Sequence, residues 1–359
     1  MADRIYNFNP GPATLPLPAL KKAQEEFLNY RETGMSIIET SHRSPEFEGV
    51  LEDTKSLIKE LLKVPDDYHI LFLGGGASLQ FAMIAMNFIP EAGSADYINT
   101  GTWSTKAIKE AGIIARHNVA ATSEDKNFCY IPEKFNFDPN AAYVHITTNN
   151  TIKGTQWHEF PDTAGKPLLA DMSSDIMSRT LDVAKFAMIY AGAQKNLGPS
   201  GVTVIMIQDE FAKTAREGLP TMLSYDTHIK KNSLFNTPPV FPIYMVKLVM
   251  EWIKDQGGLE EVDKINRKKA DLIYDAIDGS DGYYKGTAQK KDRSIMNLTM
   301  RMENEDLEKK FISKAKEKNL HGLKGHRSVG GIRASMYNAF PLEGAEKLAE
   351  FMQQFKKNN

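Results

Sequence analysis

A lysine in a glycine-rich segment is the most distinctive chemical feature of the sequence. Lys195 lies in Ala193-Gln194-Lys195-Asn196-Leu197-Gly198, between two apolar runs that predict buried strands. A primary amine at the carboxyl end of such a strand can form a Schiff base when its surroundings lower its pKa. A lysine among glycines can equally be a solvent-exposed loop charge, so Lys195 needs chemical partners to be a candidate catalytic residue.

Asp171 is the first such partner, because it ends the apolar run of the preceding predicted strand. The carboxyl ends of parallel strands meet at one edge of an open α/β sheet, which is where ligands bind. An acid in this place either caps the following turn or pairs with a cationic ligand atom such as a protonated pyridine nitrogen.

Three glycines, Gly74-Gly75-Gly76, join another predicted strand to a predicted helix. Backbone amides and the positive end of a helix would meet a phosphate there. The segment matches neither of the usual nucleotide-binding glycine patterns, so a nucleotide is not specified. A phosphate cradle, Asp171 and Lys195 at neighbouring strand ends supply three anchors for pyridoxal 5'-phosphate, one each for its phosphate, its ring nitrogen and its aldehyde.

Two basic clusters could bind a doubly anionic substrate. The first contains His42 and Arg43, and the second contains His326, Arg327 and Arg333. Arginine binds carboxylate and phosphate as a bidentate partner, although such residues also form ordinary surface ion pairs. The eight histidines show no ligand spacing of a metal site, so we expect no metal.

The elements that would position these residues follow an α/β order. Short apolar runs alternate with amphipathic stretches from residue 68 to residue 208, which predicts a mostly parallel central sheet covered by helices. Seven strands are expected, at 69–73, 96–100, 113–119, 143–147, 167–171, 187–191 and 203–207. Helical patterns over 18–30 and 45–62 precede the sheet and should flank it.

The pattern changes after residue 207, where long helical segments over 242–255 and 259–277 precede two apolar runs, 295–300 and 331–335. Helical stretches over 305–318 and 342–355 accompany these runs, which is typical of a small α+β domain. We therefore expect three parts: an N-terminal arm, residues 1–16, associated with the small domain; a large cofactor-binding domain, residues 17–257; and a small C-terminal domain, residues 258–359.

Charge and cysteine content narrow the class of protein. The 359 residues carry 44 Lys and Arg against 46 Asp and Glu, so the net charge of -2 attracts neither nucleic acid nor an anionic membrane. The single cysteine, Cys129, excludes an intramolecular disulfide and fits a reducing compartment. The sequence contains no apolar signal core and no stretch of membrane-spanning length. We expect a cytoplasmic protein.

The sequence resembles the class V, fold type I aminotransferases that depend on pyridoxal phosphate, and among them the phosphoserine aminotransferase family, nearly from end to end. The motifs that carry the resemblance are Phe8-Asn9-Pro10-Gly11-Pro12, Ser41-His42-Arg43, Gly74-Gly75-Gly76, Ala170-Asp171-Met172-Ser173-Ser174, Ala193-Gln194-Lys195-Asn196, Phe235-Asn236-Thr237-Pro238-Pro239, Gly325-His326-Arg327 and Gly331-Ile332-Arg333. The lysine motif marks the wider class, whereas the Asn-Thr-Pro-Pro and Gly-His-Arg segments are more specific to this family.

The resemblance implies transamination between L-glutamate and 3-phosphohydroxypyruvate, giving O-phospho-L-serine and 2-oxoglutarate in serine biosynthesis. It implies that Lys195 holds the cofactor and then moves a proton at the substrate α-carbon, and that Asp171 keeps the pyridine nitrogen protonated. The cofactor would further contact Gly76, Ala77, Trp103, Thr151 and Gln194, together with Asn236 and Thr237 of the partner subunit in a homodimer with shared sites. Substrate anions would be bound by His42, Arg43, His326, Arg327 and Arg333, with Arg333 on the α-carboxylate. Some relatives have arginine where this chain has Ala77, so one phosphate contact is absent or supplied elsewhere.

Three other interpretations remain open on the sequence alone. Another class V aminotransferase, acting on a different small acid, would share Asp171 and Lys195 without needing so many basic residues. A non-catalytic protein that binds pyridoxal phosphate could keep the fold, although the retained lysine argues against it. A Schiff-base aldolase on a (β/α)8 barrel has a similar alternation of strands and helices, but the C-terminal part of this chain does not alternate.

Overall fold

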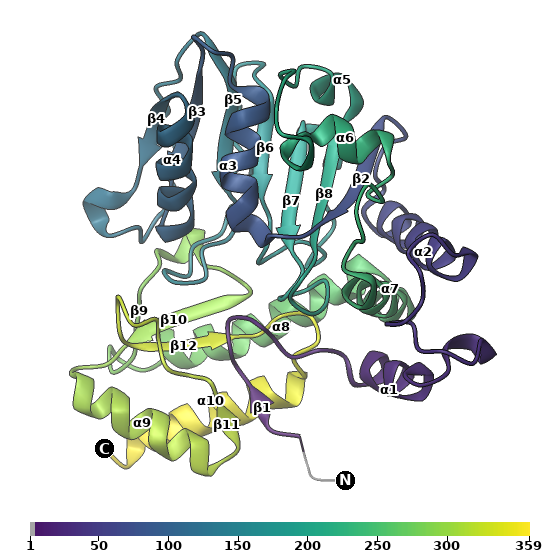
Figure 1. The fold of residues 1–359 in the computed structure, drawn as a ribbon. Coiled ribbons are helices and arrows are strands. Elements are labelled where there is room, and N and C mark those ends of the chain that lie inside the picture. The colour runs from purple at the N-terminus through teal and green to yellow at the C-terminus, as the bar shows by residue number, and fades with distance from the viewer. Residues whose placement is uncertain (1–3) are drawn as a thin grey trace.

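The computed structural model describes residues 4–359, and a seven-stranded sheet lies at its centre (Figure 1). In sheet order the strands are β2 (Tyr68–Leu73), β8 (Thr203–Gln208), β7 (Met188–Gly192), β6 (Leu168–Asp171), β5 (Ala141–Thr147), β3 (Ser94–Asn99) and β4 (Arg116–Thr122). β8 is antiparallel to both of its neighbours, and every other neighbouring pair is parallel. The mostly parallel sheet predicted from the sequence is therefore confirmed.

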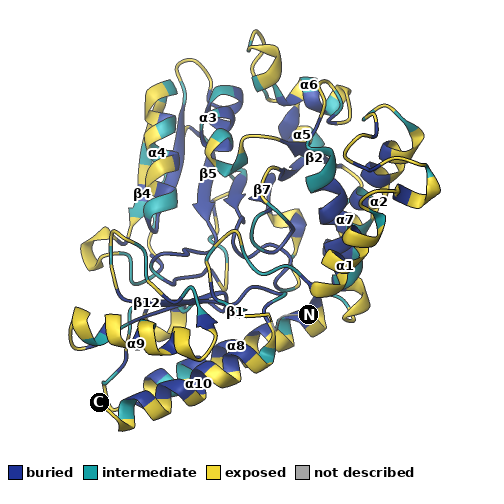
Figure 2. Ribbon diagram, turned by 60° about the horizontal axis from the view of Figure 1, so that its bottom comes forward, coloured by how far each residue is buried: buried dark blue, intermediate teal, exposed yellow. Residues whose placement is uncertain are grey.

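Helices cover both faces of this sheet. On one face lie α3 (Gly76–Phe88), α4 (Thr102–Ile114) and α6 (Tyr225–Lys230). On the other lie α2 (Pro45–Leu62) and α7 (Val240–Asp255), with α1 (Leu17–Glu26) packed against α7. Every residue of β6 and β7 is buried, and Asp171, the last residue of β6, is the one charged residue among them. Strands covered by helices on both faces are apolar in this way. The covering helices turn their exposed sides outward (Figure 2).

Two predicted boundaries are wrong, and one connection within the sheet departs from the alternation of strands and helices expected over residues 68–208. Ile113 belongs to α4, which ends at Ile114, and β4 begins only at Arg116. The apolar pair Ile113-Ile114 lies in the last turn of the helix, and the strand opens with the polar residues Arg116-His117-Asn118. The helix expected over 18–30 ends at Glu26, and a short 3-10 turn, η1 (Tyr30–Glu32), follows it. β7 returns to β8 as a hairpin, because residues 193–202 are too few for a crossover helix.

A second sheet of three antiparallel strands has the order β12 (Ile332–Ser335), β10 (Asn297–Arg301) and β9 (Lys285–Gly286). Its core is completed by α8 (Leu259–Asp278), α9 (Glu305–Glu317) and α10 (Leu342–Lys357). α9 and α10 lie on the side away from the large sheet (Figure 1). The N-terminal strand β1 (Tyr6–Asn7) pairs in parallel with β11 (Leu320–His321). The division into an arm (1–16), a large domain (17–257) and a small domain (258–359) stays a proposal.

Short elements complete the chain: α5 (Asp209–Ala212) and the 3-10 turns η2 (Glu124–Lys126), η3 (Val183–Lys185), η4 (Thr221–Leu223) and η5 (Lys290–Asp292). Among residues 4–359, no helix is long and apolar enough to cross a membrane. Over the same range, no three His, Cys, Asp or Glu side chains are arranged to hold a metal ion.

A buried lysine donates hydrogen bonds to the turn between β12 and α10. Lys269 of α8 is 0% exposed, and its Nζ donates to the carbonyls of Tyr337 (2.8 Å) and Phe340 (3.1 Å). A buried acceptor that loses its donor has no water to replace it. The bonds of Lys269 should therefore contribute to the stability of the small domain.

We expect Lys269→Met, which keeps most of the side-chain volume but removes the donor, to lower the free energy of unfolding by about 1–3 kcal/mol. Chemical denaturation followed by circular dichroism measures the change. Lys268→Met alters an exposed neighbour on the same helix and should stay within about 0.5 kcal/mol of the wild type. Equal stability of the two variants would mean that the bonds of Lys269 contribute nothing net.

Candidate active site

A cavity of about 270 Å³ lies at the edge where the parallel strands end. Because β2, β3, β5, β6 and β7 run in the same direction, the residues that follow them meet at this edge. The residues predicted from the sequence that line the cavity are Gly76, Ala77, Trp103, Thr151, Asp171, Gln194, Lys195, His326 and Arg333. The structure thus brings together residues from these strand ends and from the small domain.

Lys195 lies in the connection between β7 and β8. The amide of Ala193 donates to the carbonyl of Val202 (3.0 Å), and the amide of Gly198 donates to the carbonyl of Ala193 (2.8 Å), so the connection is a closed turn. Burial lowers the pKa of Lys195 to about 8, although the nearby carboxylate of Asp171 opposes the shift. The neutral amine, which is the nucleophilic form, is therefore available close to physiological pH.

Asp171 is the last residue of β6 and is buried. Ser173 donates to Asp171 Oδ1 from its backbone amide (2.9 Å) and from its hydroxyl (2.6 Å), and the amide of Gly192 donates to the Ser173 hydroxyl (3.0 Å). Burial raises the pKa of Asp171, whereas the bonds from Ser173 and the charge of Lys195 counteract the rise. Within residues 4–359 no donor bonds to Oδ2, which leaves that oxygen available to a cationic ligand atom.

The glycines at the end of β2 turn the chain into α3. Gly75 and Gly76 have φ angles of 85° and 65°, so two successive residues adopt the left-handed conformation that glycine tolerates. α3 begins at Gly76, and the cavity wall includes Gly76, Ala77 and Ser78. Unpaired amides and the positive end of the helix dipole make this corner of the cavity suitable for an anion.

Trp103, Thr151 and Arg333 form a chain of contacts across the cavity. Trp103 Nε1 donates to the Thr151 hydroxyl (3.1 Å), and Arg333 Nη1 donates to the Thr151 carbonyl (2.9 Å). Lys195 Nζ lies 5.9 Å from the centre of the Trp103 ring. Arg333 is only 6% exposed, yet its Nε has no hydrogen-bond partner within the described part of the chain. A buried guanidinium in the cavity wall with a single side-chain hydrogen bond among residues 4–359 suits an anionic ligand.

These groups fit pyridoxal 5'-phosphate, which combines a phosphate, a basic ring nitrogen and an aldehyde. The helix end at Gly76 suits the phosphate, the free oxygen of Asp171 suits a protonated ring nitrogen, and the buried amine of Lys195 suits the aldehyde. The unpaired Nε of Arg333 remains for a further anion, such as a substrate carboxylate.

Five predicted residues do not line this cavity within a single chain. Asn236 and Thr237 are exposed and border a different cavity near β2. His42 and Arg43 precede α2, where Arg43 is exposed, and Arg327 is exposed in the loop before β12. These residues could contact a bound ligand only if a substrate or a second chain came close to them. The roles expected for them therefore stay predictions.

Several lining residues were not predicted as site residues: Pro10, Gly11, Ser78, Thr147, Asn149, Ile152, Ser173 and Ser174. Ser173 and Ser174 could have been found from the sequence, because they continue the polar segment that starts at Asp171. Gly11 carries no such local signal. A Cβ at Gly11 would lie 3.4 Å from Lys195 Cγ, and that closeness arises between segments far apart in the chain.

Comparison with known proteins agrees with this geometry. The family model described as aminotransferase class-V matches residues 5–348. The phosphoserine aminotransferase of Desulfosudis oleivorans is 56% identical over 361 residues, covering 100% of each chain. The solved phosphoserine aminotransferase from Bacillus circulans subsp. alkalophilus superimposes with a TM-score of 0.97 at 52% identity, covering 99% of each chain.

A third similar protein is described with its cofactor. The structure of PLP-bound phosphoserine aminotransferase from Trichomonas vaginalis has a TM-score of 0.93 at 36% identity, covering 98% of this chain and 100% of that one. Agreement of the family model, the full-length identity and the fold leads to one conclusion. The chain belongs to the class-V aminotransferase family and, within it, to the phosphoserine aminotransferases.

Proposed function

We propose that the chain transfers the amino group of L-glutamate to 3-phosphohydroxypyruvate, giving 2-oxoglutarate and O-phospho-L-serine, a step of serine biosynthesis. The observation that carries the proposal is the meeting of Lys195, Asp171 and the anion-binding corner at Gly76 in one cavity. The full-length identity to phosphoserine aminotransferases supports this choice of substrates. A cytoplasmic location is part of the proposal, since the lone Cys129 fits a reducing compartment.

Pyridoxal 5'-phosphate, when bound, supplies an electron sink for the bonds of the substrate α-carbon. The amine of Lys195 would hold it, and the carboxylate of Asp171 would pair with its ring nitrogen. Gly76, Ala77 and Gln194 would hold its phosphate together with Asn236 and Thr237 of the partner subunit, and Trp103 and Thr151 would hold its ring.

The side chains of this protein divide the remaining work. Lys195 accepts and returns the proton of the substrate α-carbon, a task that requires an amine whose neutral form is accessible. Arg333 binds the α-carboxylate that every substrate shares, because its buried guanidinium has an unpaired donor. The distal phosphate or the glutamate side-chain carboxylate is bound by His42, Arg43, His326 and Arg327.

A homodimer with shared active sites is part of the proposal. Exposed apolar side chains gather in the segment from α1 to α2, where Leu28 is 81% exposed and Ile38 is 51% exposed. Apolar surface of this kind is typical of a protein interface. Asn236 and Thr237 are exposed as well, as residues that serve a neighbouring chain would be.

The amine of Lys195 should titrate well below its ordinary pKa of 10.5. In the protein freed of cofactor, acetic anhydride should modify Lys195 at a rate that rises with pH around a midpoint of about 8, as followed by peptide mass spectrometry. Asp171→Asn removes a carboxylate that favours the charged amine, so the midpoint should move to lower pH. Asp255→Asn makes the same change at an exposed position and should leave the midpoint in place. A wild-type midpoint near 10.5 would contradict a buried catalytic amine.

The arginines should distinguish phosphorylated from unphosphorylated acceptors. Arg43 and Arg327 are exposed in the single chain, and in the proposed complex the bound phosphate and the partner subunit would bury them. Truncating one partner of a buried charge pair costs about 2–5 kcal/mol, so Arg43→Ala or Arg327→Ala should lower kcat/KM for 3-phosphohydroxypyruvate by roughly one to four orders of magnitude. Hydroxypyruvate lacks the phosphate, so kcat/KM for hydroxypyruvate should change little in these two variants. Arg333→Ala should lower kcat/KM for both acceptors, because both carry the α-carboxylate. Equal losses for both acceptors in Arg43→Ala and Arg327→Ala would show that these two residues do not bind the phosphate.

Mixed dimers test the shared site. Lys195→Ala removes the amine, and Thr237→Glu places a carboxylate that would repel the cofactor phosphate in the partner's site. Each homodimer should be inactive, whereas a purified heterodimer contains one intact site and should recover about half of the wild-type activity. Full activity in the Thr237→Glu homodimer, or none in the heterodimer, would rule out sharing through Thr237.

A further inference from the structure

The turn formed by residues 148–157 lies between the two domains and reaches the catalytic cavity. Its two legs pair in antiparallel fashion at Asn149 and Gln156. Thr151 lies at its tip and lines the cavity. Whatever fixes this turn therefore fixes Thr151.

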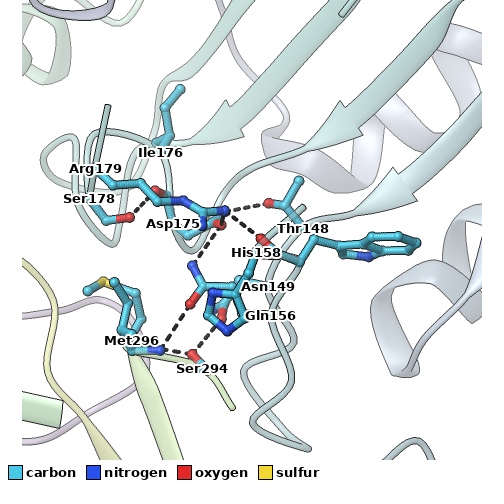
Figure 3. Close-up of polar contacts among 12 residues, drawn as sticks. Thr148, Asn149, Gln156, His158, Asp175, Ile176, Ser178, Arg179, Ser294 and Met296 are labelled. Atoms are coloured by element: carbon cyan, nitrogen blue, oxygen red, sulfur yellow. Dashed lines mark hydrogen bonds and ion pairs between the residues drawn. The ribbon is translucent and has the colours of Figure 1, made fainter. Parts of the chain in front are cut away.

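Asp175 holds both legs of the turn (Figure 3). The hydroxyl of Thr148, on the first leg, donates to Asp175 Oδ1, and the side-chain nitrogen Nε2 of Gln156, on the second leg, donates to Asp175 Oδ2 at 3.1 Å. The guanidinium of Arg179 lies 3.9 Å from Oδ2. Asp175 is only 6% exposed, and burial raises its pKa while Arg179 and the two hydrogen bonds oppose the rise. This carboxylate does not line the catalytic cavity, so it can influence the reaction only through the groups it holds.

The same turn is bonded to the small domain. Gln156 Oε1 accepts a hydrogen bond from the amide of Ile295 (3.0 Å), and Asn149 Nδ2 donates to Asn297 Oδ1 (2.8 Å). Gln156 therefore connects the carboxylate of Asp175 on one side with the strand region of β10 on the other.

The tip of the turn sets the orientation of Arg333. The bond from Arg333 Nη1 to the Thr151 carbonyl (2.9 Å) is the one side-chain hydrogen bond that Arg333 makes among residues 4–359. Gly154, with a φ angle of 76°, lies so close to β10 that a Cβ would be 2.5 Å from Thr299 Oγ1. The turn therefore packs against the small-domain sheet, whose strand β12 contains Arg333.

We propose that Asp175 is a positioning residue for substrate binding. By accepting hydrogen bonds from both legs of the turn, its carboxylate fixes the Thr151 carbonyl and thereby orients the guanidinium of Arg333 in the cavity. The inference rests on the proposed role of Arg333 as the group that binds the substrate α-carboxylate.

The directions of the hydrogen bonds explain why a carboxylate is required. Because Gln156 uses its oxygen to accept from Ile295, its amide nitrogen must donate toward Asp175. Gln156→Glu would place a second carboxylate oxygen opposite Asp175, and like charges at this separation repel. Asp175→Asn in the same chain would offer an amide nitrogen to that glutamate and restore a donor–acceptor pair.

The experiment compares wild-type holoenzyme with Gln156→Glu and with Gln156→Glu/Asp175→Asn. In Gln156→Glu we expect KM for hydroxypyruvate to rise about tenfold while kcat changes by less than about threefold, since the reacting groups stay in place. The Kd of maleate, an unreactive dicarboxylate, should rise by a similar factor when measured by calorimetry. In the double variant both values should return to within about threefold of the wild type.

Controls separate this inference from the proposed function. Gln289→Glu makes the same change at an exposed position and should alter neither KM nor the Kd of maleate. If Arg333→Ala leaves maleate binding intact, the proposed role of Arg333 in binding the carboxylate is wrong, and the inference about Asp175 is wrong as well. If Arg333→Ala weakens binding but Gln156→Glu does not, or if the double variant is no better than Gln156→Glu, Asp175 does not position Arg333 and the proposed function stands. A loss confined to kcat or thermal stability also overturns the inference.

Discussion

The amine of Lys195 and the carboxylate of Asp171 must lie close together in a buried site where water solvates neither group well. Asp171 ends β6, and Lys195 follows β7, its parallel neighbour, so the two side chains start from adjacent strand ends. Burial raises the pKa of Asp171 and lowers that of Lys195, while their mutual attraction opposes both shifts. The charge of Asp171 is stabilised first by the hydroxyl of Ser173 and then by Lys195, whereas the charge of Lys195 is stabilised chiefly by Asp171. The spacing of these two strands is therefore a chemical constraint as well as a structural one.

The large sheet satisfies this constraint by its burial and by one reversed strand. Helices cover both faces, so water is excluded from β6 and β7 along their whole length. Because β8 runs antiparallel to β7, Lys195 lies in a short turn closed by the bond between Ala193 and Val202. A lysine in a closed turn has fewer backbone conformations than one in a long crossover, which keeps its amine near Asp171.

The two domains contribute different parts of the chemistry. The large domain provides the amine, the carboxylate and the helix end at Gly76, whereas the small domain provides Arg333 from β12. The amine that we propose for proton transfer and the guanidinium that we propose for the substrate carboxylate therefore come from different parts of the fold. The turn of residues 148–157, bonded to both, determines how these parts are placed relative to each other, because its Thr151 carbonyl receives the guanidinium of Arg333.

Most strand positions and the placement of Lys195 and Asp171 at strand ends could be predicted from the sequence, because alternation, glycines and strand ends are properties of short segments. Ile113 shows the limit of such patterns, since the apolar pair Ile113-Ile114 belongs to the end of α4, whereas β4 opens with the polar residues Arg116-His117-Asn118. The reversal of β8, the approach of Gly11 to Lys195 and the bonds of Asp175 to the 148–157 turn have no local signature. They depend on the packing of segments far apart in the chain, and packing of this kind is settled by the shape and hydrogen-bonding needs of the whole interior.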